Sequence, residues 1–333
     1  MSGIAAAATI DLHAHAVLPA TFGLAGRYGP DLYRNSAGQQ CFRVAKYTMV
    51  GARYEGSPFT DPDERIRQMD AAKIDYQVIG PNPLAYFHFV ETNIAVDYCR
   101  AHNDVMRDIV APRSARLGGL AMLPMQSVEA AREELARSVG DLGLQGVQIG
   151  TDFPMMLDDP ALDVLYEDLV RLNVPLFIHP GNAGIDGPEG DFRLGRFDLG
   201  TTIGYAAQET IAVATLVFGG VLDRHPDLKV WVSHGGGMLG FMAGRLSLAS
   251  RKRPWASDAL KQDGGFEERV AKIWFDNHVH SADALSLLTN MVGTDRIVHG
   301  TNFAGWDQPN YDEVPAPPAY TADNARRLMG IAG

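Results

Sequence analysis

Cysteine is scarce in this chain, with two residues among 333, Cys41 and Cys99. Two cysteines without a Cys-X-X-Cys spacing support neither a disulfide framework nor a zinc site built from thiolates. Basic charge is also in short supply, because 29 Lys and Arg residues face 40 Asp and Glu residues and the formal net charge is −11. This excess of negative charge argues against a nucleic-acid partner.

Long apolar runs are absent as well. No apolar stretch approaches the roughly 18 residues that a membrane-spanning helix requires, so we expect no membrane association. The N-terminal segment has no basic residue before its short apolar stretch and runs directly into Asp11, unlike a secretory signal. We therefore expect a cytoplasmic protein. The composition, 46% hydrophobic and 21% charged, is that of an ordinary globular protein and excludes a disordered chain.

Short apolar or β-branched runs recur along the whole chain and alternate with stretches of helical apolar spacing. They predict eight strands, at Thr9–Leu12, Asp75–Ile79, Gly118–Leu123, Gly146–Ile149, Pro175–Ile178, Val230–Ser233, Ile273–Phe275 and Ile297–Val298. Helices are predicted at Asp61–Ala72, Asn93–Ile109, Ser127–Leu142, Pro160–Leu172 and Glu209–His225. Near-continuously apolar strands are typical of a parallel sheet that is buried on both faces.

Eight strand–helix units without a break in composition predict an α/β fold, a single (β/α)8 TIM barrel spanning residues 1–333 as one domain. Residues 18–62 form a long insertion after strand 1 in this interpretation, and residues 181–200 form a loop after strand 5. A doubly wound open sheet is the alternative. No GxGxxG turn follows the first strand, so no dinucleotide-binding fingerprint supports it.

Seven of the ten histidines lie at or just after the ends of predicted strands: His13, His15, His179, His234, His278, His280 and His299. In a barrel the carboxyl ends of the strands meet at one face, so these side chains converge on one cavity. His13 and His15 are two residues apart on a strand and point the same way. On its own such a pair is more often two polar residues on one face, but His179 and His234 at equivalent strand ends favour a metal site. Imidazole nitrogens suit Zn²⁺, with Mn²⁺ and Fe²⁺ as less exclusive alternatives.

Three further features are candidates for binding a substrate carboxylate. The glycines at 235–237 either bring backbone amides close to a bound anion or simply form a tight turn. Arg43, after the first strand, and Arg245, about three helical turns beyond His234, could each grip a carboxylate with both guanidinium nitrogens. Taken singly, each arginine would more often be a solvated surface residue.

The motifs Asp-Leu-His13-Ala-His15, Phe-Ile-His179-Pro, Val-Ser-His234-Gly-Gly-Gly and Gly-Thr-Asn302-Phe together resemble the decarboxylase-related branch of the amidohydrolase superfamily. The similarity continues to the terminal Asn324-Ala325 and covers nearly the whole chain. The resemblance implies a (β/α)8 barrel whose divalent metal, usually zinc, is held by His13, His15, His179 and the residue at position 302. It also implies that His234 acts as general acid and base.

The resemblance further implies that Arg43 and Arg245 bind the carboxylate of a small-molecule substrate. Arg245 would reach in from a neighbouring subunit, so we expect a homodimer. Position 302 departs from the pattern, because this chain has asparagine where the family has a catalytic, metal-binding aspartate. The oxygen of Asn302 can still coordinate a metal, but an amide cannot act as a base at neutral pH. Proton transfer would then depend on His234, and Asp307 is a nearby carboxylate that could substitute.

These observations lead to one principal function and two alternatives. We expect a metal-dependent, O₂-independent decarboxylase, a carbon–carbon lyase acting on a small unsaturated or aromatic carboxylic acid such as those of aromatic-compound catabolism. The first alternative is a metal-dependent hydrolase or hydratase of a lactone or unsaturated acid. The second is a catalytically impaired binding relative in which Asn302 marks a lost active site. Fold alone cannot choose between these functions.

Overall fold

The computed structural model describes residues 3–312 and 316–331. Its centre is a set of parallel strands that run through the whole chain, each in the place that the apolar runs predict. The strands are β1 (Ile10–Ala16), β5 (Tyr76–Pro81), β6 (Leu117–Gly119) with β7 (Ala121–Met122), β8 (Val147–Ile149), β9 (Leu176–Ile178), β10 (Val230–Val232), β11 (Trp274–Asp276) and β12 (Ile297–Val298). Their residues are buried throughout, as a parallel sheet covered on both faces requires.

The strands pair in sequence order, β1–β5–β6 in one sheet and β7 through β12 in the other. Leu120 joins the sheets at one side, because its amide bonds to Ile79 O at 2.9 Å while the next amide, of Ala121, bonds to Gly146 O at 2.9 Å. Leu12 N donates to His299 O at 3.0 Å and joins them at the other side. The prediction of a TIM barrel is therefore confirmed. The doubly wound alternative is wrong, because the strand order never reverses.

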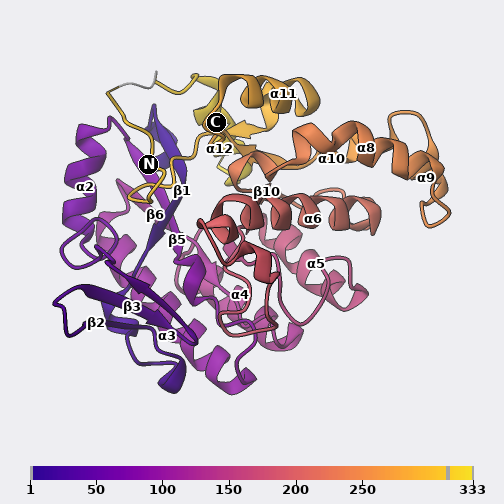
Figure 1. Cartoon of the computed structure of the whole chain (residues 1–333). Coiled ribbons are helices and arrows are strands. Elements are labelled where there is room, and N and C mark those ends of the chain that lie inside the picture. The colour runs from indigo at the N-terminus through magenta and orange to yellow at the C-terminus, as the bar shows by residue number, and fades with distance from the viewer. Residues whose placement is uncertain (1–2, 313–315, 332–333) are drawn as a thin grey trace.

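Helices follow the strands and cover the outside of the barrel (Figure 1). Their starts carry the expected caps: the Asp61 carboxylate accepts the amides of Asp63 and Glu64 at the start of α2, and the Ser127 hydroxyl accepts the amide of Ala130 at the start of α4. The helices are α1 (Gly3–Ala6), α2 (Pro62–Ala71), α3 (Thr92–Val110), α4 (Val128–Gly140), α5 (Asp163–Leu172), α6 (Tyr205–Phe218), α7 (Val221–Arg224), α8 (Leu239–Lys252), α9 (Asp258–Lys261), α10 (Gly265–Val270), α11 (Ala282–Val292) and α12 (Tyr320–Leu328). Among the helices of the described residues, none combines the length and apolar character needed to cross a bilayer.

The chain between β1 and α2 forms a separate antiparallel sheet in the order β2–β3–β4. Its strands are β2 (Asp31–Arg34), β3 (Gln40–Val44) and β4 (Tyr47–Val50). This sheet lies beside the barrel, at the lower left of Figure 1. Tyr47 and Met49 of β4 line a cavity of about 880 Å³, so the extra sheet forms part of its wall.

A buried polar network holds β1 in place. Arg65 of α2 donates to His15 O at 2.5 Å and to Gln77 Oε1 at 2.6 Å. Gln77 Nε2 and Thr301 Oγ1 both donate to the Asp11 carboxylate at 2.7 Å. Because buried polar groups are costly when they lack partners, this network fixes the position of the strand that carries the first two histidines.

Candidate active site

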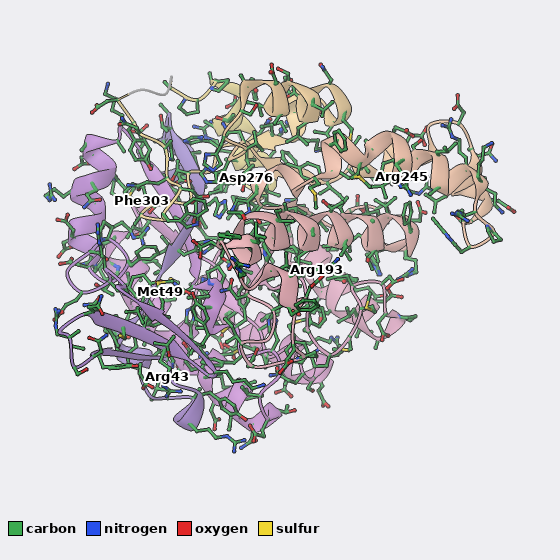
Figure 2. All side chains as sticks on the ribbon, in the orientation of Figure 1. Arg43, Met49, Arg193, Arg245, Asp276 and Phe303 are labelled. Atoms are coloured by element: carbon green, nitrogen blue, oxygen red, sulfur yellow. The ribbon has the colours of Figure 1, made fainter. Side chains whose placement is uncertain are left out.

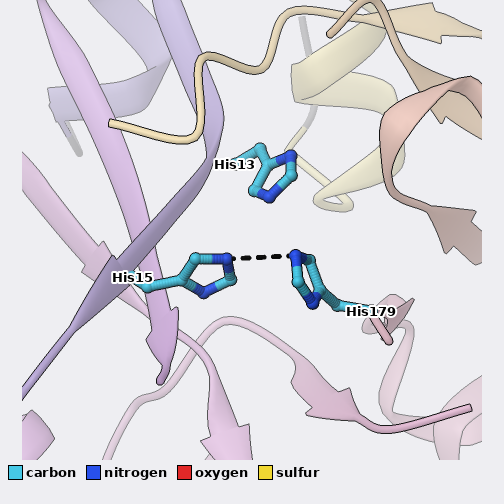
Figure 3. Close-up of side chains that lie close together, drawn as sticks. All are labelled: His13, His15 and His179. Carbon is cyan, nitrogen blue, oxygen red and sulfur yellow. Dashed lines mark hydrogen bonds between the residues drawn. The ribbon is translucent and has the colours of Figure 1, made fainter. Parts of the chain in front are cut away.

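His13, His15 and His179 come together at the carboxyl ends of the barrel strands (Figure 3). The first two lie on β1, where the pairing with β5 is irregular between Asp11 and Ala14, and the third directly follows β9. Their nearest nitrogens all lie within 4.8 Å of one another, and His15 Nε2 is 3.2 Å from His179 Nε2. Two ligands of one tetrahedral ion are about 3.3 Å apart when each metal–nitrogen bond is about 2.0–2.1 Å. The three side chains therefore already have ligand spacing.

Each of these histidines is oriented through its other ring nitrogen. Nδ1 of His13 lies 2.8 Å from the Asp276 carboxylate. Nδ1 of His15 lies 3.0 Å from Pro81 O, and Nδ1 of His179 lies 2.7 Å from Pro180 O. Because these acceptors take a proton from Nδ1, the Nε2 lone pairs are left to face a ligand. His13 Nε2 is buried and has no hydrogen-bond partner, as expected of an atom that coordinates a metal ion.

The electrostatics of the group also suit metal binding. Burial lowers the pKa of His13 to about 4, although the Asp276 carboxylate opposes this shift. Burial and the neighbouring imidazoles hold the pKa values of His15 and His179 well below the ordinary value. All three rings are neutral at pH 7, which is the form that coordinates a cation. The donor set, the orphaned nitrogen and the neutral rings fit a divalent metal ion.

The histidines open onto a cavity of about 880 Å³. Its wall includes His15, His179, His234, Asn302 and Asp307, while His13 is buried behind them with no exposed surface. The remaining wall is mainly aromatic and apolar, with Tyr47, Tyr54, Phe59, Leu84, Tyr205, Met238, Phe241, Leu287 and Trp306 among its residues. A cavity of this size and lining accommodates a small conjugated molecule.

His234 stands next to the metal-capable group, with its ring centroid 4.9 Å from that of His13 and 5.1 Å from that of His179. Its Nδ1 lies 2.6 Å from the carboxylate of Glu209, which is fully buried on α6. Burial alone would lower the pKa of His234, but the Glu209 carboxylate outweighs it and raises the pKa to about 9. The Glu209 carboxylate therefore favours the protonated form of His234, the form that can donate a proton.

The glycines after His234 form a turn and do not present an anion site. The amides of residues 235, 236 and 237 bond to Asp276 Oδ1 at 3.3 Å, Ser233 O at 2.8 Å and His234 O at 3.0 Å. Of the two interpretations of this run, the structure supports the tight turn, because none of these three amides remains free for a substrate carboxylate.

Asn302 lies on the cavity wall, in the loop after β12, as predicted. Its Nδ2 donates to Asp307 Oδ1 at 2.7 Å, so the amide oxygen is the atom that can turn toward a metal ion. Asp307 Oδ2 lies 3.2 Å from His278 Nε2 and 3.3 Å from His280 Nε2. The pKa of Asp307 is lowered well below its usual range, because these histidines outweigh the effect of burial. A carboxylate thus stands beside the asparagine.

Neither Arg245 nor Arg43 is among the described residues that line the cavity, and a role for either in binding a substrate carboxylate stays a prediction. Arg43 has partners within its own sheet and the adjoining loops. Its guanidinium is held by the Asp31 carboxylate, Arg27 O at 2.9 Å and Ala45 O at 3.2 Å, because the pairing of β2 with β3 places Asp31 opposite Arg43. Figure 2 shows Arg43 on the small sheet, well away from Asp276, and Arg245 on the exposed part of α8. Among the described residues, Arg53 is the one arginine or lysine on the wall.

Sequence reasoning missed three residues of this site: Glu209, Asp276 as the partner of His13, and Arg53. Glu209 had a signal, since it is the one acidic residue in the otherwise apolar or neutral segment 205–218. A lone carboxylate in such a helix needs a buried partner. Asp276 directly follows an apolar strand, where a functional group is expected in a barrel. Nothing in the local sequence distinguishes Arg53 from Arg43.

The sequence matches the family model described as Amidohydrolase over residues 10–330. The chain therefore belongs to the amidohydrolase family, and the resemblance inferred from the histidine motifs is confirmed. It is 33% identical over 298 residues to 2-amino-3-carboxymuconate-6-semialdehyde decarboxylase of Dictyostelium discoideum, an alignment that covers 88% of this chain and 81% of that protein.

Solved structures share the fold. A 2,6-dihydroxybenzoate decarboxylase from Rhizobium superposes with a TM-score of 0.76 at 22% identity, covering 97% of this chain and 98% of that one. A dihydroxybenzoic acid decarboxylase from Polaromonas, solved with bound manganese and an inhibitor, superposes with a TM-score of 0.72 at 20% identity, covering 97% and 96%. At these identities the structures establish a common architecture, the TIM barrel.

Proposed function

We propose that this protein is a metal-dependent, O₂-independent decarboxylase of a small unsaturated or aromatic carboxylic acid. One observation carries the proposal: three histidines with ligand spacing stand beside His234, whose Nδ1 is bound by the buried Glu209 carboxylate, in one mainly apolar cavity. The 33% identity to a decarboxylase over most of the chain supports this reaction over hydrolysis. The preserved donor set also argues against an impaired binding protein, which has no need for converging buried imidazoles.

The residues of the chain supply binding and proton transfer. A divalent ion held by His13, His15, His179 and the oxygen of Asn302 would supply Lewis-acid stabilisation of negative charge on the substrate. His234 donates its proton to the substrate carbon that carries the carboxylate, while Glu209 stabilises the imidazolium beforehand. The carbon–carbon bond then breaks, its electron pair stays with the conjugated substrate, and CO₂ leaves. His234 regains a proton from water.

We propose that Arg53 takes the anchoring role expected of Arg43. It lies on the cavity wall and makes no ion pair within 4.0 Å among the described residues, whereas Arg43 is paired with Asp31. A guanidinium can bind a carboxylate with two parallel hydrogen bonds. Arg53→Met should raise KM about tenfold or more, since a hydrogen bond to a charged group contributes about 1.5–3 kcal/mol. Arg34→Met on β2, an arginine outside the cavity wall, is the control. A KM that responds only to Arg43→Met would refute the assignment.

The metal, location and assembly are proposed on separate grounds. Zinc is the proposed ion because the donor set is mainly imidazole, with manganese as the alternative.

Cys41 and Cys99 are both free and buried, which suits a reducing compartment and supports a cytoplasmic location. A homodimer is proposed because Phe241, Arg245 and Leu248 share one exposed face of α8, and Phe241 is 87% exposed.

The deciding experiment is CO₂ release from conjugated carboxylic acids by the metal-loaded protein. Wild-type protein should release CO₂ without consuming O₂, and His13→Asn and His234→Asn should each lower the rate by about 100-fold or more, since a positioned acid alone supplies about 10²–10⁴. An accumulating hydrated or hydrolysed product without CO₂ would identify the hydratase or hydrolase alternative. Tight binding of the acids without turnover would identify a binding protein.

A further inference from the structure

A second group of potential metal ligands lies on the same cavity wall. His234 follows β10, His278 follows β11, and Asp307 lies in the loop after β12. One ligand atom from each lies within 4.8 Å of the others, as in the first group. The two groups adjoin, because the His234 ring centroid is 4.9 Å from that of His13 and the His278 ring centroid is 5.8 Å from it.

The second group repeats the ligand spacing of the first. His278 Nε2 lies 3.2 Å from Asp307 Oδ2, the same separation as that between the Nε2 atoms of His15 and His179. This is close to the roughly 3.3 Å expected of two ligands on one tetrahedral ion. A cation could replace the proton that now joins His278 to Asp307 without a large movement of either side chain.

The second group also repeats the way in which a ligand is oriented. A buried carboxylate binds Nδ1 of His234 at 2.6 Å, just as Asp276 binds Nδ1 of His13 at 2.8 Å. Both carboxylates, Glu209 and Asp276, have no exposed surface. Metal-ligating histidines almost always donate their other ring N–H to such an acceptor. Both groups therefore contain a histidine whose Nδ1 is held by a buried carboxylate, and in His234 an ion would bind Nε2 by displacing its proton.

The charges around the cavity favour a second cation. The three histidines of the first group contribute no negative charge of their own, whereas Asp307, Asp276 and Glu209 are three carboxylates in contact with ligand histidines. Arg53 is the one arginine or lysine among the described residues that line the cavity. The local excess of carboxylates can offset the repulsion between two neighbouring divalent ions.

We propose that His234, His278 and Asp307 form a second divalent-metal site, adjacent to the first and weaker than it. It is weaker because an ion must displace the proton on His234 Nε2 and the hydrogen bonds of Asp307 to His278 and His280. It must also bind beside another cation. Occupancy would use His234 Nε2 as a ligand and remove it from proton transfer. Excess metal should therefore inhibit the enzyme, a consequence that rests on the proposed role of His234.

Manganese titration of the chelator-treated protein tests the site without reference to activity. Elemental analysis should find two ions per wild-type chain at excess Mn²⁺, and electron paramagnetic resonance should show an exchange-coupled pair. Asp307→Asn and His278→Asn should each retain one ion with an uncoupled spectrum and weaken the second binding step about tenfold or more. Asp312→Asn, at an exposed carboxylate in the same region, is the matched control and should bind two ions.

Several results would overturn the second site: one ion per wild-type chain at excess Mn²⁺, two ions without coupling, or two coupled ions in both Asp307→Asn and His278→Asn. Circular dichroism of the variants checks that they fold. The outcome is separable from the proposed decarboxylation, because ion counting needs no substrate. If two ions bind but excess Mn²⁺ inhibits wild type and Asp307→Asn equally, the site stands and the proposed role of His234 in proton transfer fails.

Discussion

At the scale of single residues, the site depends on which ring nitrogen of each histidine carries the proton. Asp276 accepts from Nδ1 of His13, and backbone carbonyls accept from Nδ1 of His15 and His179. Because these acceptors hold the proton on Nδ1, the lone pair of each ring is on Nε2 and is available to a metal ion. The acceptors are as necessary for binding as the ligands.

Asp276→Asn should weaken metal binding by about 10–100-fold with little change in size. Asp276 Oδ1 accepts hydrogen bonds from the backbone amides of Gly235 and His278, so the oxygen of an asparagine at this position would take over both hydrogen bonds. The NH₂ group would then donate to His13 Nδ1, force the proton onto Nε2 and remove the ligand lone pair. Competition with a chelator measures the metal affinity, and Asp283→Asn on the exposed start of α11 is the control. Equal affinities in all three proteins would contradict this account.

At the scale of elements, the turn from β10 into α8 is the most constrained segment of the site. Residues 234–237 all have positive φ, at 46°, 61°, 75° and 67°. A Cβ at Gly237 would lie 2.1 Å from Ala206 O, which is backbone and cannot move aside easily. The glycines are needed because only they adopt these angles without strain and allow α6 to approach the turn.

Gly237→Ala should lower the free energy of unfolding by roughly 2 kcal/mol or more, from backbone strain and the clash with Ala206. Gly244→Ala provides a matched control within α8, where a Cβ would meet nothing within 4 Å. That change should raise the free energy of unfolding by about 0.5–1 kcal/mol, because alanine favours the helix. Urea denaturation compares the two. Similar stabilities for both variants would show that the turn tolerates a side chain.

Helix α3 carries a buried titratable residue outside the cavity, His102. Its Nδ1 lies 3.4 Å from Asn103 Oδ1. Burial lowers the pKa of His102 from 6.5 to about 4. The unfolded chain therefore binds a proton between pH 6.5 and 4 that the folded chain does not bind. The stabilising effect of the neutral ring is complete above pH 6.5 and is lost as the pH falls toward 4.

His102→Gln should make the stability of the metal-free protein less dependent on pH between 7 and 5. The slope of unfolding free energy against pH should fall by at most about 1.4 kcal/mol per pH unit, the value for one proton. Urea denaturation in the presence of a chelator, at pH 7 and pH 5, measures both proteins. The assignment fails if the variant loses as much stability on acidification as the wild type does.

At the scale of the whole molecule, α8 and α9 project from the side of the barrel (Figure 1). Phe241 and Leu248 are 87% and 48% exposed on the face of α8 that also carries Arg245. An exposed apolar face of this kind is typical of a surface that binds another protein. A second copy packed there would bury these side chains and bring Arg245 toward a neighbouring subunit, as the family resemblance implies.

Phe241→Glu should convert a dimer into a monomer, because a buried glutamate without a partner opposes association. A loss of about 2–3 kcal/mol would raise the dimer dissociation constant by roughly 100-fold, the scale expected of an interface hot spot. Light scattering after gel filtration measures the mass, and Val164→Glu on the exposed part of α5 is the control. A wild-type monomer, or a Phe241→Glu variant that remains dimeric, would reject this interface.

The sequence alone was sufficient for the barrel and for the first ligand group. Buried parallel strands are near-continuous apolar runs, and their carboxyl ends must meet at one face. Once eight such runs were located, His13, His15, His179 and His234 could be placed together without any knowledge of distances. Both steps succeed because they depend on local patterns and on a topology with few alternatives.

Only the tertiary structure decided which charged residues complete the site. Arg43 and Arg53 are ten residues apart on the same insertion, but pairing of β2 with β3 directs the first to Asp31 and leaves the second on the cavity wall. Glu209 and Asp307 reach His234 and His278 across 25 and 29 positions of sequence. Contacts of this kind depend on how separate elements pack, and no local periodicity encodes that packing.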